Sequence, residues 1–154
     1  MSETLRVSLR VRPLALGGCV LFGSLLPSSS YAEAEPSTLN VVEFRTSVND
    51  EKGVVRCALF NREGWLKKPV RSAFAKPSAG SALCVFRRVP AGTFGISAFH
   101  DENSNGKLDT NFVGIPVEDY CASRDARGTF GPPSFEDASF QYRGGSKRLF
   151  ARMK

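Results

Sequence analysis

The chain has 154 residues, enough for one ordinary domain, and 21 basic against 15 acidic residues give it a net charge of +6. Its basic residues are scattered along the sequence, so the charge does not predict a nucleic-acid partner. A solvated surface is the simplest interpretation of this charge. Weak attraction to anionic envelope polymers or lipid headgroups is the alternative.

The first 34 residues have the layout of a secretory signal peptide. Three arginines within the first twelve residues precede an apolar run of fifteen residues, and Ala32-Glu33-Ala34 fits the small-x-small pattern of a cleavage site. The run is too short for an ordinary transmembrane helix, which needs about 20 residues. The sequence therefore predicts a signal peptide over residues 1–34 and an exported protein, periplasmic or secreted, with no stable membrane insertion after cleavage. The alternatives are an uncleaved anchor, a buried core helix, or lipid attachment at Cys19.

The mature chain begins with two predicted strands, residues 39–46 and 53–60. The second strand has apolar residues on both faces, which is typical of a strand covered on both sides. Glycines and prolines interrupt residues 61–82, which predicts a long connection with an irregular edge strand. Two strands follow at 83–89 and 93–100, and the Pro-Ala-Gly between them has the turn chemistry of a tight hairpin.

The C-terminal third contains an irregular region, residues 114–133, and then a predicted closing hairpin. Its arms are residues 135–143 and 146–154, joined across Gly144-Gly145. Six or seven short strands with Gly/Pro turns predict an all-β domain over residues 35–154. The expected architecture is a single antiparallel β-sandwich of about seven strands, Ig-like in its general layout.

Four cysteines occur, and the expected cleavage removes Cys19. An odd number of three in an oxidising compartment predicts one disulfide and one free thiol. Cys57 and Cys84 both lie in predicted strands, whereas Cys121 lies in a predicted loop. We therefore expect a disulfide between Cys57 and Cys84 with Cys121 free. The alternative is that Cys57 and Cys84 are reduced core residues.

The loop after the 93–100 strand has the ligand spacing of a calcium loop. Oxygen-bearing side chains recur at every second position, and a glycine at the sixth position permits a sharp turn. The candidate ligands are Asp101, Asn103, Asn105, Lys107 through its backbone carbonyl, Asp109 and, if the chain folds back, Glu118. Position twelve of the motif is Phe112 rather than a bidentate Glu, so any Ca²⁺ affinity should be weak. The alternative is a loop without metal, because Asp and Asn also stabilise turns by bonding their own backbone.

Catalysis is the second interpretation of the same region. His100 is the only histidine, and with Asp101 or Glu102 it could serve as the general base of a small envelope hydrolase. Glu102 and Glu118 could act as paired carboxylates for glycoside cleavage. No serine or cysteine lies in a recognised nucleophile motif. We therefore expect no enzymatic activity and no catalytic residues.

Several rare segments occur in the order typical of one bacterial family, domain of unknown function 2141 (DUF2141). The sequence VPAGTFGISAFHDENSNGKLDTNFVGIPVEDY, followed by FGPPSFEDASF, resembles that family over about residues 39–152. The resemblance implies a secreted or periplasmic protein with a sandwich similar to prealbumin-type domains, and it implies no particular function. We expect structural roles for the matching residues Gly92, His100, Gly106, Gly114, Pro116, Pro132, Pro133 and Phe135.

The sequence as a whole predicts an exported, non-enzymatic module of unknown role. Its polar loop, residues 100–118, would bind Ca²⁺ or another ligand, and no further cofactor is expected. A carbohydrate- or peptide-binding module is a further alternative, with Trp65, Phe112 or Tyr120 as aromatic platforms. Envelope polysaccharide or peptide would then be the partner.

Overall fold

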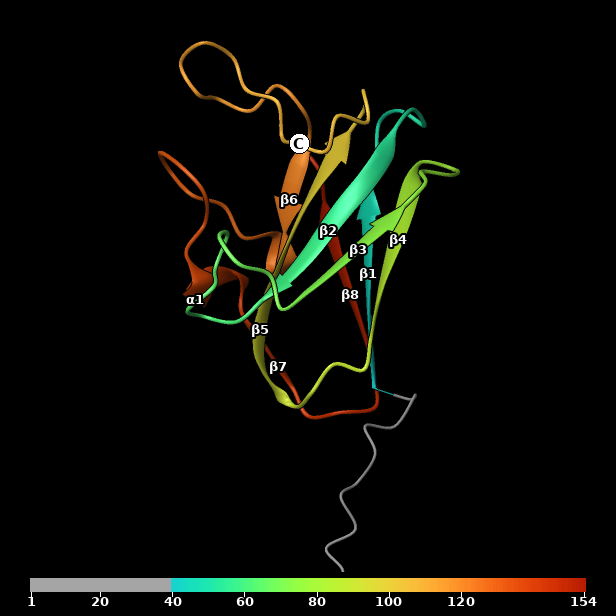
Figure 1. Ribbon diagram of the computed structural model, residues 1–154, viewed down its shortest axis with the longest axis vertical. Helices are drawn as coiled ribbons and strands as arrows, with labels where there is room; N and C mark the ends of the chain where they lie inside the picture. The colour runs from blue at the N-terminus through green and yellow to red at the C-terminus, as the bar shows by residue number, and fades with distance from the viewer. Residues whose placement is uncertain (1–39) are drawn as a thin grey trace, which may run out of the picture. The chain divides into compact units, whose positions relative to one another are not determined.

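The computed structural model describes residues 40–154, so the expected signal peptide lies outside the described residues. Eight strands form two sheets, and only one short α-helix and one 3-10 turn interrupt them in this part of the chain (Figure 1). The elements in chain order are β1 (Val41–Ser47), β2 (Val54–Phe60), β3 (Arg71–Ala75), β4 (Ser81–Arg87), β5 (Gly92–Asp101), β6 (Tyr120–Ala122), η1 (Ser123–Asp125), α1 (Phe135–Ala138), β7 (Phe140–Tyr142) and β8 (Ser146–Arg152).

The all-β expectation is confirmed, and the two sheets divide the strands unequally. One sheet has three strands in the order β4-β1-β8. The other has five, in the order β3-β2-β5-β6 with β7 also paired to β5. The expected edge strand in the long connection is β3, which pairs with β2 alone. The number of strands is eight, rather than about seven.

The predicted pairing of strands is wrong in three places. β4 and β5 do not form a hairpin, because β4 pairs with β1 in one sheet and β5 pairs with β2 in the other. The closing hairpin is likewise absent, since β7 pairs with β5 and β8 with β1. β1 and β8 run parallel, so the arrangement is not purely antiparallel. Gly144 and Gly145 have positive φ, as a turn there requires, but local turn chemistry does not determine the sheet that the next strand joins.

The two sheets share one hydrophobic core. β1 and β4 contribute alternate residues such as Phe44 and Phe86, and β2 and β5 contribute residues such as Leu59 and Ile96, all at most 1% exposed. The expected disulfide between Cys57 on β2 and Cys84 on β4 is confirmed, and it joins the two sheets through this core. Burial of alternate residues explains why strands with period-two apolar patterns form here.

Cys121 is free, as expected, but it lies in β6 rather than in a loop. Burial raises the pKa of its thiol to about 11. At about pH 8 we expect roughly one thiol in a thousand to be ionised. Cys121 in the folded protein should therefore resist iodoacetamide, and Cys121 in the protein unfolded in guanidinium chloride should be labelled. Rapid labelling of the folded protein would contradict this burial, and mass spectrometry distinguishes the two results.

No helix within residues 40–154 is long and apolar enough to cross a membrane.

Candidate functional site

The predicted polar loop connects β5 to β6 and extends beyond the end of the sheet (Figure 1). It folds back on itself as a short ladder: the Val117 amide donates to the Asp109 carbonyl, and the Asn111 amide donates to the Ile115 carbonyl. An isolated bridge between Thr110 and Pro116 lies between these bonds. The fold-back brings Glu118 to the start of the loop, as the Ca²⁺ interpretation requires.

Asp101, the last residue of β5, anchors the loop with a fully buried carboxylate. Its Oδ2 accepts hydrogen bonds from Arg56 Nε at 2.5 Å and from the Gly106 amide at 2.9 Å, and its Oδ1 accepts one from the Asn105 amide at 2.9 Å. Burial opposes ionisation, but these three bonds outweigh it and hold the pKa of Asp101 below its ordinary value. Asp101 is therefore ionised and positioned by Arg56 of β2 and by two backbone amides of the loop.

The asparagines of the motif stabilise the turn in the way their spacing predicts. Asn103 Oδ1 accepts from the Asn105 amide at 3.0 Å, and Asn105 Oδ1 accepts from the Lys107 amide at 2.8 Å. Gly106 has φ +84°, a left-handed conformation that a side chain would strain. The motif thus folds as a sequence of tight turns with its polar side chains on the inside of the curve.

Asp109 completes the cluster from the far side of the turn. Its carboxylate accepts from the Asn103 amide group at 2.6 Å and from the Asn105 amide group at 2.9 and 3.0 Å. Four of the predicted ligands, Asp101, Asn103, Asn105 and Asp109, are thereby brought into one hydrogen-bonded cluster. No contact of the Lys107 carbonyl with this cluster is present in the described residues.

Glu118 is buried and reaches the same loop, but it bonds the backbone. Its Oε1 accepts from the Glu102 amide at 3.1 Å, and its Oε2 accepts from the Asp109 amide at 2.9 Å. A carboxylate that holds two amides in this way fixes both ends of the turn. Glu118 therefore closes the loop at its base.

The cluster offers hard oxygen donors, which fit Ca²⁺ better than a softer metal. Ca²⁺ accepts carboxylate, amide and backbone carbonyl oxygens in flexible geometry. Within residues 40–154 there is no group of three or more His, Cys, Asp or Glu side chains arranged for a metal, because half of the donor side chains in this cluster are amides. The positive charge of Arg56 beside Asp101 also reduces the net negative charge available to a cation.

His100 lies next to the loop and has a structural position. Its ring is fully buried, and Nε2 donates to the Lys52 carbonyl at 2.7 Å, which ties the β1–β2 connection to β5. Nδ1 has no hydrogen-bond partner and lies 3.9 Å from Glu102 Oε1. A buried imidazole that already donates its proton to a carbonyl is poorly placed to reach a substrate.

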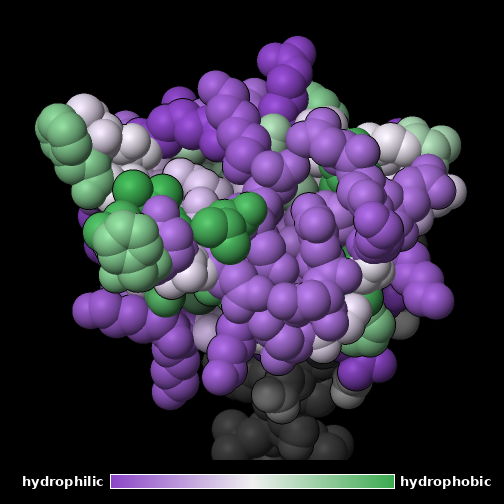
Figure 2. All heavy atoms as spheres, turned by 90° about the horizontal axis from the view of Figure 1, so that it is seen from above, coloured by the Kyte–Doolittle hydropathy of each residue, from purple (hydrophilic) through white to green (hydrophobic). Residues whose placement is uncertain are grey.

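The tip of the loop is apolar and exposed. Phe112 is 99% exposed, and Val113, Ile115 and Val117 are each at least 60% exposed. Figure 2 looks onto this end of the molecule and shows green side chains gathered on one side of a largely purple face. An apolar tip on a polar base is unusual for a loop that only connects two strands.

The other proposed platforms differ from Phe112. Trp65 packs edge-on against Phe60 and Phe135, with centroids 5.5 and 5.7 Å apart, and its indole N–H donates to the Pro133 carbonyl at 2.9 Å. Trp65 therefore fixes the Gly-Pro-Pro segment against the five-stranded sheet. Tyr120 is half-buried. Of these three aromatic residues, Phe112 is the one that is free to contact a ligand with its whole ring.

Arg56 is the site residue that sequence reasoning missed. It is the only charged residue in β2, whose other members are all apolar. A charge in the middle of such a strand indicates a specific partner, and that signal was available from the sequence. The sequence does not identify that partner, because Asp101 lies 45 residues further along the chain.

These features define the class: an all-β protein of two sheets, with a loop rich in Asp and Asn that follows β5 and is held by internal hydrogen bonds. The chain belongs to the bacterial family described as "Uncharacterized protein conserved in bacteria (DUF2141)", whose family model matches residues 45–149. The resemblance noted from the motifs is thereby confirmed. No curated protein and no solved structure matches the chain.

Proposed function

We propose that the protein is an exported, non-enzymatic β-sandwich module of prealbumin-like or Ig-like type, in which the loop after β5 binds Ca²⁺ and presents an apolar tip to a partner. Export is supported by the layout of residues 1–34, and the sandwich by the single core that two sheets share. The role of the loop is supported by the clustering of its polar side chains.

One observation carries the Ca²⁺ proposal. Side chains spaced two residues apart, Asp101, Asn103 and Asn105, lie on the inside of one turn and are joined there by Asp109. Asp101, Asn103, Asn105, the Lys107 carbonyl and Asp109 would hold the ion, and Glu118 would support them from outside. When bound, the ion would supply a positive charge at the centre of the turn.

The charge balance sets the expected affinity. Arg56 already neutralises Asp101, so Asp109 contributes most of the unbalanced negative charge within the cluster. With one net charge and several neutral oxygens, we expect a dissociation constant of roughly 10⁻⁴–10⁻³ M, the range of extracellular modules. Such a site is loaded at the millimolar calcium of an external medium and empty in a cytoplasm.

The His100 hydrolase is not favoured, because the ring is buried and its N–H is engaged. A specific observation favours carbohydrate or peptide binding as the second candidate: the loop tip exposes Phe112 beside three aliphatic residues. That role is compatible with Ca²⁺ binding, since the ion would stiffen the base from which the tip extends.

Thermal melting with and without Ca²⁺ tests the proposal. At tenfold excess over the dissociation constant, Ca²⁺ should stabilise the folded state by about 1.4 kcal/mol. For a domain of this size the melting temperature should rise by about 5 °C. Asp109→Asn should abolish most of this rise, because it removes the unbalanced charge while keeping one oxygen.

Matched controls make the result specific. Glu51→Gln removes one exposed carboxylate at the same end of the molecule and should keep the full Ca²⁺ shift. Asp101→Asn is a poor test because it also breaks the Arg56 ion pair. A wild-type shift below about 1 °C in millimolar Ca²⁺ would refute a site in this affinity range.

A further inference from the structure

The outer face of the three-stranded sheet, opposite the core, combines positive charge with an apolar floor. The register of β4, β1 and β8 places its side chains in four rows of three, formed around Val41, Glu43, Arg45 and Ser47 of the central strand. Alternating burial along all three strands assigns these side chains to the solvent side. This face lies on a different sheet from the loop discussed above.

Each of the four rows contains one arginine. Arg87 pairs with Val41 in the first row, Arg148 pairs with Glu43 in the second, Arg45 is central in the third, and Arg152 pairs with Ser47 in the fourth. Successive rows are about 6.7 Å apart, because alternate residues of a strand share a face. The four rows that carry the arginines therefore extend along the strand direction over roughly 20 Å.

The charges on this face are mostly available to a ligand. Glu43 is the only acidic residue among the twelve positions, and it is paired with Arg148 at 2.8 Å, which leaves a surplus of three positive charges. The Arg148 side chain is still 83% exposed. Arginine presents a planar set of N–H donors that matches carboxylates and phosphates in two-point contact.

Apolar side chains lie between the arginines. Leu83 and Phe150 flank Arg45 in the third row and are 38% and 48% exposed, and a shallow hollow runs beside them. Phe150 also lies under the Arg152 guanidinium, 5.9 Å from its ring centroid. Such a floor can pack against the C–H faces of sugar rings while the arginines contact acidic groups.

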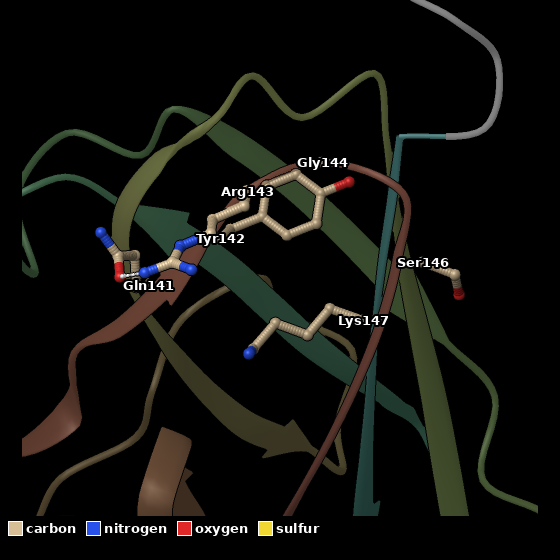
Figure 3. Close-up of a pocket in the computed structure, with 6 residues that line it drawn as sticks. All are labelled: Gln141, Tyr142, Arg143, Gly144, Ser146 and Lys147. Atoms are coloured by element: carbon tan, nitrogen blue, oxygen red, sulfur yellow. Dashed lines mark hydrogen bonds between the residues drawn. The ribbon is translucent and has the colours of Figure 1, made fainter.

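A second basic hollow lies at one end of this face. It lies at the turn between β7 and β8, where Arg143 bonds Gln141 at 3.2 Å and Lys147 lies over Phe140. Figure 3 shows Lys147 and Ser146 pointing to opposite sides of β8, as strand alternation requires. Ser146 belongs to the outer face and also lines the hollow, so the hollow adjoins the first row of this face at the start of β8.

We propose that the outer face of the β4-β1-β8 sheet binds an extended acidic polysaccharide. A polyuronate carries a carboxylate on every sugar, which suits charges repeated along a strand. Single-stranded nucleic acid fits less well, because it binds through successive aromatic platforms and Phe150 is the only aromatic residue of the twelve. The inference does not depend on Ca²⁺ binding by the loop.

Equilibrium binding of the purified full chain to polygalacturonate tests the proposal, with neutral dextran as the uncharged probe. We expect saturable binding to polygalacturonate that weakens with salt, and none to dextran. Arg45→Gln with Arg87→Gln should weaken binding about tenfold and make the dependence of log affinity on log salt shallower by about 1.4, by analogy with two lost phosphate contacts. Phe150→Ser should also weaken binding but leave the salt slope unchanged.

The control is Lys68→Gln with Arg71→Gln, which removes the same charge from exposed residues in and beside β3, on the other sheet. It should retain nearly full affinity. Absence of polygalacturonate binding at low salt would overturn the proposal. Equal weakening of binding by both double variants would also overturn the proposal, because net charge alone would then explain the binding. Tighter binding of a single-stranded oligonucleotide of matched charge would likewise overturn the proposal and would indicate nucleic acid as the ligand.

Discussion

Arg56→Met is expected to lower the free energy of unfolding by about 2–4 kcal/mol, because it leaves the Asp101 carboxylate buried with only two backbone amides as partners. The estimate lies below that for a fully buried pair because the Arg56 side chain is 39% exposed. Asp101→Asn should lower the free energy of unfolding by less, since the freed guanidinium of Arg56 can turn into solvent. Urea unfolding at neutral pH measures both variants.

Arg62→Met is the matched control. Arg62 also pairs with a carboxylate, that of Glu136, but both side chains are more than half exposed. Loss of this pair should cost less than about 1 kcal/mol. If Arg56→Met were no more damaging than Arg62→Met, Arg56 would not hold the loop.

The cost of Arg56→Met should depend on pH. The pKa of Asp101 is lower in the folded protein than in the unfolded chain, so its ionisation stabilises the fold above its unfolded pKa, about 3.9. That contribution disappears as the pH falls through the folded pKa. The difference between wild type and Arg56→Met should therefore be largest above about pH 5 and should shrink in acid. A difference that stays constant down to about pH 2 would contradict this role for Asp101.

Removal of the disulfide should have a comparable effect. The bridge between Cys57 and Cys84 closes a loop of 27 residues, and the chain-entropy model gives about 3.5 kcal/mol for a loop of that length. The double variant Cys57→Ala with Cys84→Ala should therefore melt roughly 15 °C lower than wild type. Cys121→Ala, which removes the free buried thiol, controls for loss of a core sulfur and should melt much closer to wild type. Equal losses in the two proteins would mean that packing, not the cross-link, carries the effect.

The sequence predicted individual elements better than their partners. Strand positions followed from alternating apolar residues, and the disulfide followed because Cys57 and Cys84 both lie in predicted strands. The hairpins were wrong because Pro90-Ala91-Gly92 and Gly144-Gly145 permit a turn whether the next strand stays in the same sheet or crosses to the other. The parallel pairing of β1 and β8 joins the two ends of the domain, and no local pattern encodes it.

The α-helix at Phe135–Ala138 was missed although its signal was present. Ser134 accepts from the Asp137 amide at 3.1 Å and also bonds the Asp137 side chain, which is a helix start of the Ser-x-x-Asp kind. Alternating apolar residues in the same segment suggested a strand instead. In the loop, spacing indicated the Asx turns as one of two interpretations, whereas the fold-back to Glu118 was a condition that the sequence did not settle. It could not predict Arg56, whose role depends on pairing between β2 and β5.

The most direct test of the central claim is a residue-resolved NMR titration of the protein with Ca²⁺. The amides of Asn105, Gly106 and Lys107 donate to the candidate ligands Asp101, Asn103 and Asn105, so they should report binding first. We expect their signals to shift together and to saturate at roughly 10⁻⁴–10⁻³ M Ca²⁺, and we expect Asp109→Asn to abolish the shifts. Signals that do not move, or small shifts spread over all acidic surfaces without saturation, would contradict a Ca²⁺ site in this loop.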